Sequence, residues 1–109
     1  MRKIRDVYII TDEFATAINF EKHEVEYDSK NVAAFSSYNK ALKAVKHITN
    51  ESLKSWKDEY PNKGFHTEEH RKTNALSHFI DIHIQGLGKD NTLANKYIVE
   101  TIAIEHFKL

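Results

Sequence analysis

Hydrophobic side chains recur with two different periods along the chain, and these periods predict where strands and helices lie. Residues 5–12 (RDVYIITD) are rich in β-branched and aromatic side chains over a short run, which indicates a β-strand. Residues 14–30 (FATAINFEKHEVEYDSK) indicate a second strand or a hairpin. We expect Phe20, Val25 and Tyr27 to be its buried positions.

A predicted short strand over residues 31–37 (NVAAFSS) runs into the longest regular pattern of the chain. Its closing serines are suited to a helix start, because a serine side chain can accept a hydrogen bond from a free backbone N–H of the first turn. Ser36 or Ser37 is therefore the expected N-cap. The helix itself is predicted over residues 37–60.

One face of this predicted helix is apolar. At about 100° per residue, its apolar side chains fall within an arc of roughly 140°. Pro61 ends the helix, and the pattern allows either one continuous helix or two nearly collinear ones broken at Thr49 and Asn50. The arc consists of Tyr38, Ala41, Leu42, Val45, Ile48, Ser52, Leu53, Trp56 and Tyr60.

The second half of the chain is predicted to end in two strands. Residues 62–78 are polar, and we expect a short helix there, capped by Thr67. Residues 78–85 alternate between apolar and polar side chains, as a strand with one dry and one wet face does. Residues 96–109 favour a final strand over the alternative helix from Thr92, since β-branched residues dominate. The last two strands are expected to pair as an antiparallel hairpin.

These elements predict one α+β domain over residues 1–109. Its antiparallel sheet has about four or five strands, and the long amphipathic helix packs on one face. The chain has 109 residues, within the usual size of one domain. It contains no run of 18 apolar residues and no signal-peptide pattern, so we expect a cytoplasmic protein without a membrane partner.

Composition narrows the possible chemistry. Cysteine is absent, which excludes disulfides, thiolate metal sites and thiol catalysis. The 16 basic residues balance 16 acidic ones, so no global positive field draws the protein to nucleic acid. A local patch remains possible on the helix, where four lysines share an arc beside the apolar one. This lysine patch either is a solvated helix face or meets phosphates or an acidic protein surface. It consists of Lys40, Lys43, Lys54 and Lys57.

The segment HTEEH, at residues 66–70, has the order of a zinc-peptidase motif. In such a motif His66 and His70 bind zinc one helical turn apart, and Glu69 activates water. The motif also needs a third ligand, and the basic residues Arg71 and Lys72 follow directly. We therefore interpret the segment as the polar start of the short helix, without a metal.

Two further groups have a structural and a functional interpretation. Asp81 and His83 share one face of a predicted strand, but no nucleophile is singled out to join them, so they are expected to be solvated. Trp56 lies in the apolar arc and is expected in the core or in a dimer interface. Alternatively, Trp56 forms an exposed aromatic patch with Tyr60 and Phe65.

Three stretches resemble the layout of small proteins encoded by bacteriophages and mobile elements. They are VYIIT at residues 7–11, VAAFSSYNKALKAVKHI at residues 32–48 and KYIVETIAIE at residues 96–105. The resemblance implies a compact α+β unit and a phage accessory protein, a class that includes inhibitors of host defence and proteins that sequester ligands. The shared pattern contains scaffold residues only, so it transfers no functional residue.

We therefore predict a non-catalytic binding protein without a cofactor, which inhibits or sequesters a host component. The expected partner is a host protein with an acidic surface or an anionic nucleotide-like ligand, and the chain is expected to form a homo-oligomer. The alternatives are a zinc-dependent hydrolase that uses HTEEH and a structural oligomerisation module. The expected binding residues are Lys40, Lys43, Lys54, Lys57, Tyr60, Phe65, His66, His70, Arg71 and Lys72.

Overall fold

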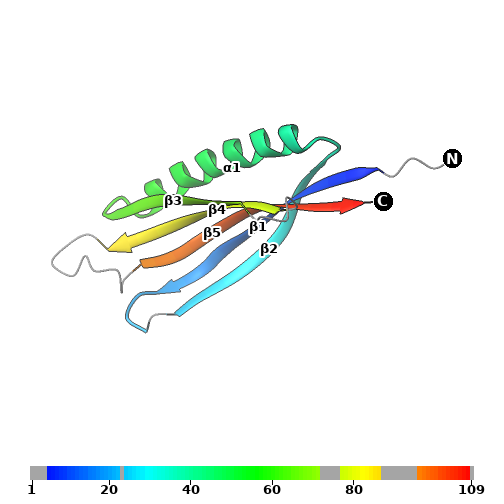
Figure 1. The fold of residues 1–109 in the computed structure, drawn as a ribbon. Coiled ribbons are helices and arrows are strands. Elements are labelled where there is room, and N and C mark those ends of the chain that lie inside the picture. Colours follow the sequence, from blue (N-terminus) through cyan, green and yellow to red (C-terminus); the bar gives the residue numbers. More distant parts are fainter. Residues whose placement is uncertain (1–4, 23, 72–76, 87–95, 109) are drawn as a thin grey trace.

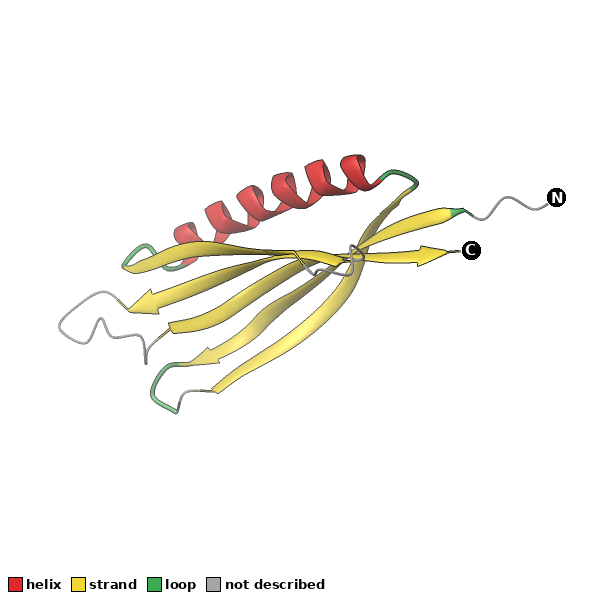
Figure 2. Cartoon of the chain, viewed as in Figure 1, coloured by secondary structure: helices red, strands yellow, loops and turns green. Residues whose placement is uncertain are grey.

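The computed structural model describes residues 5–22, 24–71, 77–86 and 96–108, which form two layers. One helix packs on one face of a five-stranded antiparallel sheet, as the sequence predicted (Figures 1 and 2). The strand order is β2-β1-β5-β4-β3. The elements are β1 (Asp6–Asn19), β2 (Glu24–Phe35), α1 (Tyr38–Glu59), β3 (Lys63–Arg71), β4 (Ser77–Gly86) and β5 (Lys96–Lys108).

The first and last strands lie side by side in the middle of the sheet. Residues of β1 and β5 pair antiparallel, for example Ile10 with Ile104. The predicted pairing of the last two strands is confirmed, because β4 and β5 are antiparallel neighbours. The strand predicted over residues 5–12 continues to Asn19, and residues 14–30 form the predicted hairpin between β1 and β2.

The core lies between α1 and the central strands. Alternate residues of β1, β4 and β5 point toward the helix, which contributes Ala41 and Val45. Each large aliphatic side chain that is fully buried contributes about 1.5–3 kcal/mol. The remaining arc of the helix packs partly buried against this core, which confirms the predicted apolar face. The fully buried sheet residues are Ile10, Ile82, Ile84, Val99, Ile102 and Ile104.

Helix α1 is continuous, so the alternative break at Asn50 does not occur. Ser37 is the N-cap, and its side chain accepts a hydrogen bond from the Lys40 backbone N–H at 3.5 Å. In the middle, Thr49 donates its hydroxyl to the Val45 carbonyl at 2.7 Å, so this buried polar group stays within the helix. Pro61 ends the helix because a proline disfavours helical geometry in the residue before it.

The short helix predicted within residues 62–78 was wrong, because this segment contains strand β3. Its backbone pairs with β4 from Lys63 opposite Gly86 to Arg71 opposite His78. Pairing along a sheet edge satisfies the backbone groups that a short polar helix would leave open at its ends. Thr67 is therefore a strand residue and caps nothing.

Tyr27 was also predicted incorrectly. Its side chain is 45% exposed, whereas Phe20 and Val25 pack partly buried against the core as expected. The Tyr27 hydroxyl donates a hydrogen bond to the Ile98 carbonyl at 2.6 Å, which holds the ring across the neighbouring strands.

The predicted final strand is confirmed as β5, while Thr92, from which the alternative helix would begin, lies outside the described residues. Within the described ranges no helix is both long and apolar enough to cross a membrane.

Candidate metal centre

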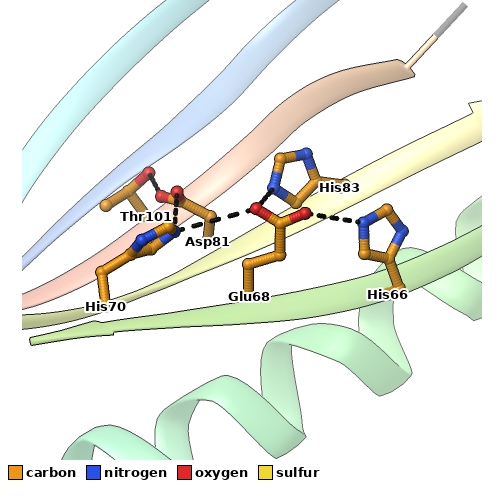
Figure 3. A network of polar contacts seen from close by, with 6 residues as sticks. All are labelled: His66, Glu68, His70, Asp81, His83 and Thr101. Carbon is orange, nitrogen blue, oxygen red and sulfur yellow. Dashed lines mark hydrogen bonds and ion pairs between the residues drawn. The ribbon is translucent and has the colours of Figure 1, made fainter. Parts of the chain in front are cut away.

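A cluster of histidines and carboxylates lies on the sheet face that α1 leaves open (Figure 3). Successive side chains of a strand point to opposite faces, so His66, Glu68 and His70 of β3 share one face. The register places His83 of β4 opposite His66, and Asp81 opposite Glu68. The pairing of two adjacent strands therefore brings five ionisable side chains together.

The Glu68 carboxylate lies between three imidazoles (Figure 3). Its Oε1 is 3.4 Å from His66 Nε2, and its Oε2 is 3.4 Å from His83 Nε2. The same Oε2 is 3.8 Å from His70 Nε2. Glu68 is thus the centre of the cluster, and each histidine presents the same ring nitrogen to it.

A second carboxylate holds His70 in place. The Asp81 Oδ2 atom is 3.2 Å from His70 Nε2, and the Thr101 hydroxyl of β5 donates a hydrogen bond to Asp81 Oδ1 at 2.6 Å. Since one oxygen of Asp81 faces His70 and the other accepts from Thr101, its carboxylate plane is fixed. The network therefore extends over three strands.

Ring stacking orients the imidazoles further. The rings of His66 and His83 stack with centroids 4.7 Å apart and an interplanar angle of 4°. The His70 ring stacks on Phe79 with centroids 4.6 Å apart. Asp81 and His83 are each only 8% exposed, so the prediction that they are solvated was wrong.

Three of these residues can hold a metal ion. The ligand atoms of His66, Glu68 and His83 all lie within 4.8 Å of one another. A tetrahedral zinc ion with bonds of about 2.0–2.1 Å separates its ligands by roughly 3.3–3.4 Å. Each 3.4 Å distance around Glu68 has this length, but His66 faces one carboxylate oxygen and His83 faces the other, so a single oxygen ligand satisfies only one of the two distances. Binding one ion therefore requires the ligand atoms of His66, Glu68 and His83 to move closer together than the 4.8 Å within which they lie.

The structure changes the interpretation of HTEEH. His66 and His70 do come together, but through strand alternation and not one helical turn apart. Glu69, the water-activating residue of the helical motif, is on the opposite face, where its Oε1 is 2.5 Å from Nε2 of the buried His78. Glu68 takes the central place instead. A strand period of two across HTEEH predicts this arrangement, whereas the zinc-peptidase motif assumes a helical period.

The other predicted binding residues do not form one surface with this cluster. The lysine patch is exposed on α1, which lies on the other face of the sheet. Tyr60 and Phe65 pack partly buried against the core, so they form no exposed patch with Trp56. Arg71 is exposed at the end of β3, and Lys72 lies outside the described residues.

Comparison with known proteins leaves this site to be judged on its geometry. No protein-family model, no curated protein and no solved structure matches the chain.

Proposed function

We propose that the protein is a non-catalytic binding protein that holds one zinc-class ion on His66, Glu68 and His83. The observation that carries the proposal is the position of the Glu68 carboxylate, 3.4 Å from an imidazole Nε2 on either side. Two imidazoles and one carboxylate favour zinc and its neighbours among the transition metals, whereas magnesium and calcium prefer oxygen ligands alone.

Residues that contact the three proposed ligands also support a metal site. Residues that bind a metal through histidine or carboxylate are usually oriented by further hydrogen bonds, which fix the ligand geometry. Here His70 lies between Glu68 and Asp81, and Thr101 fixes Asp81. We assign His70, Asp81 and Thr101 the role of positioning residues around the three ligands.

The fourth coordination position would face the open side of the sheet. The side chains of His66 and Glu68 are 37% and 43% exposed, so an external group can approach the ion from there. Zinc with three protein ligands accepts water or an anionic oxygen in the fourth position. We propose that this oxygen comes from the partner, as a carboxylate of an acidic host protein or a phosphate of a nucleotide-like ligand.

A zinc-dependent hydrolase is the second candidate, because the same open position would also bind a reactive water. Such an enzyme needs a general base near that water. Glu69 is on the wrong face, and the Asp81 carboxylate already contacts His70 and Thr101. Hydrolysis of p-nitrophenyl acetate by zinc-loaded protein, above the rate of a Glu68→Gln variant, would favour the hydrolase over the binding protein.

The lysine patch gives the proposal a separate electrostatic test. Its four lysines are exposed, and among their described neighbours Lys54 pairs with Glu51 at 3.7 Å. If an acidic partner bound at the ion also reaches α1 on the other face, replacing all four lysines by glutamate weakens binding without changing zinc affinity. Unchanged partner binding would remove the helix from the interface.

The proposed homo-oligomer would form by pairing of strands at the sheet edges. Among the described strands, β2 and β3 are the outer ones, and Val32 on β2 is 41% exposed. An unpaired edge can add a strand from a second copy, and a lysine there opposes such pairing. We expect Val32→Lys to shift the mass measured by light scattering toward the monomer. A monomeric wild-type protein would contradict the oligomer.

Native mass spectrometry of protein purified without chelator tests the metal proposal. We expect one zinc ion per chain, and loss of that ion in His83→Gln. His47→Gln is the matched control, because His47 is exposed on α1, and α1 packs on the face of the sheet opposite the ligands. Metal-free wild-type protein after addition of equimolar zinc, or zinc retained by His83→Gln, would contradict the proposal.

A further inference from the structure

A second pair of carboxyl groups lies on the covered face of the sheet, between the sheet and α1. Asp12 of β1 is 6% exposed and Glu100 of β5 is 5% exposed. Neither belongs to the metal centre, which occupies the other face. Buried carboxyl groups need partners, because burial without compensation disfavours their charged form.

The two acids differ in what they contact. Glu100 accepts hydrogen bonds from α1 on both oxygens, from Trp56 Nε1 at 2.8 Å and from the Ser52 hydroxyl at 2.9 Å. The Asp12 Oδ1 atom, in contrast, has no hydrogen-bond donor among the described residues. The pKa of Asp12 is raised to about 7, first by burial and then by a hydrogen bond to Glu100 and the charge of Glu100, while Lys30 opposes the shift. Asp12 therefore holds a proton below about pH 7, whereas Glu100 accepts hydrogen bonds from the helix.

These two acids line an open cavity. Its volume is about 350 Å³, and its wall includes the Trp56 ring and Phe14. Glu51 and Glu59 of α1 also line it, so four carboxyl groups surround the cavity. Among the described residues that line it, Lys30 of β2 is the single basic one. The cavity therefore has an excess of acidic groups and an aromatic wall.

We propose that this cavity binds a small organic cation, whose ammonium group lies on Asp12 and Glu100 and whose carbon chain packs on Trp56. A cavity of about 350 Å³ is within the size range of small-molecule sites. It is far larger than a bare metal ion. The ammonium group supplies the donor that Asp12 Oδ1 lacks, and a cation beside an indole ring gains an electrostatic attraction to the ring face.

Binding is coupled to release of the Asp12 proton. The groups that face Asp12 are Lys30 from β2, Glu100 from β5, and Glu51 and Glu59 across the cavity from α1. Below the raised pKa the cation must replace a proton, and above it the carboxylate is free to pair. We expect affinity at pH 6 to be about 10-fold lower than at pH 8.

Fluorescence titration with 1,4-diaminobutane tests this site, because Trp56 is the only tryptophan of the chain and lines the cavity. We expect a saturable change at pH 8 and no change with 1,4-butanediol, which has the same length without charge. Asp12→Asn should weaken binding about 10–100-fold, as removal of a charged hydrogen-bond partner does.

Glu13→Gln is the matched control, since Glu13 follows Asp12 in β1 but is exposed on the open face. It should bind the diamine as the wild type does. Thermal melts confirm that each variant is folded before titration, and Glu100→Gln replaces Asp12→Asn if the latter does not fold. An equal response to the diol, or diamine binding that survives both Asp12→Asn and Glu100→Gln, would overturn the proposal. So would the lack of any saturable response in the wild type.

Discussion

The two faces of the sheet solve the problem of buried polar groups in different ways. On the covered face, Glu100 receives its hydrogen bonds from Trp56 and Ser52 of the helix. On the open face the described residues include no helix, and the histidines and acids of neighbouring strands contact one another. The covered face therefore depends on contacts between layers, whereas the open face depends on strand register alone.

This difference predicts that the covered face dominates stability. Ile82 is fully buried beneath α1, and Ile82→Ala should lower the free energy of unfolding by about 2–5 kcal/mol, since it leaves a cavity. Phe79 precedes it by three residues on the open face and is half-buried. Phe79→Ala should cost less, roughly 1–2 kcal/mol, because part of its area is already in water. Urea denaturation of both variants measures this, and equal losses would contradict the comparison.

The acid pair should make the covered face sensitive to pH. The pKa of Asp12 is about 7 in the folded protein and 3.8 in an unfolded chain, so the native state binds more protons between these values. Stability should decline as pH rises from about 4 to about 7 and level off above that. The decline is at most about 4 kcal/mol, because the pKa of Asp12 differs by about three units between the two states and each unit corresponds to about 1.4 kcal/mol.

Asp12→Asn isolates this contribution. The amide has the shape of the protonated acid and does not titrate, so the decline should disappear in the variant. The measurement is the difference between wild type and variant in urea denaturation from pH 4 to pH 8, with chelator present to keep the metal centre free. A difference that does not change with pH would contradict the assignment.

A smaller effect is expected for the outer contacts of the open face. Thr101→Val removes the hydroxyl that fixes Asp81, and zinc affinity should fall about 10-fold because this contact positions His70 beside Glu68. Thr11→Val is the control, since Thr11 lies on the same face opposite Ala103. Calorimetric titration with zinc measures both variants. Equal affinity in the two would show that the network does not orient the ligands.

The smallest effect is expected at the exposed lysine patch. The pair of Lys54 and Glu51 is 3.7 Å apart with both side chains largely exposed. Such pairs contribute less than about 0.5 kcal/mol on a helix. Lys54→Ala should leave the melting temperature almost unchanged, and a fall of several degrees would mean that the helix surface is more than a solvated face.

The sequence predicted those parts of the fold in which one period dominates. The helix arc, the Ser37 cap and the alternating Ile80, Ile82 and Ile84 each follow from local pattern, and the structure confirms them. The helix predicted within residues 62–78 was wrong, because this polar segment has no apolar period that distinguishes a helix from a strand. Its strand is imposed by pairing with β4, which is a tertiary contact.

The candidate site was only partly predictable for the same reason. The sequence predicts His66, His70 and the shared face of Asp81 with His83, but the order of the zinc-peptidase motif selects Glu69 and not Glu68. Glu68 contacts His83 because β3 and β4 are neighbours in the sheet, and the sequence does not reveal this pairing. The pair of Asp12 and Glu100 is 88 positions apart in the chain and comes together through the pairing of β1 with β5, so no local pattern could reveal it.

Zinc titration of two neighbouring glutamate variants tests the central claim most directly. Glu68→Gln removes the proposed ligand, whereas Glu69→Gln changes the next residue of the same strand on the opposite face. Loss of a ligand should exceed the 10–100-fold cost of losing an outer contact, so we expect Glu68→Gln to weaken zinc binding more than about 100-fold. Glu69→Gln should bind as the wild type does. Zinc binding that survives Glu68→Gln, or that Glu69→Gln abolishes, would contradict the metal centre on the open face.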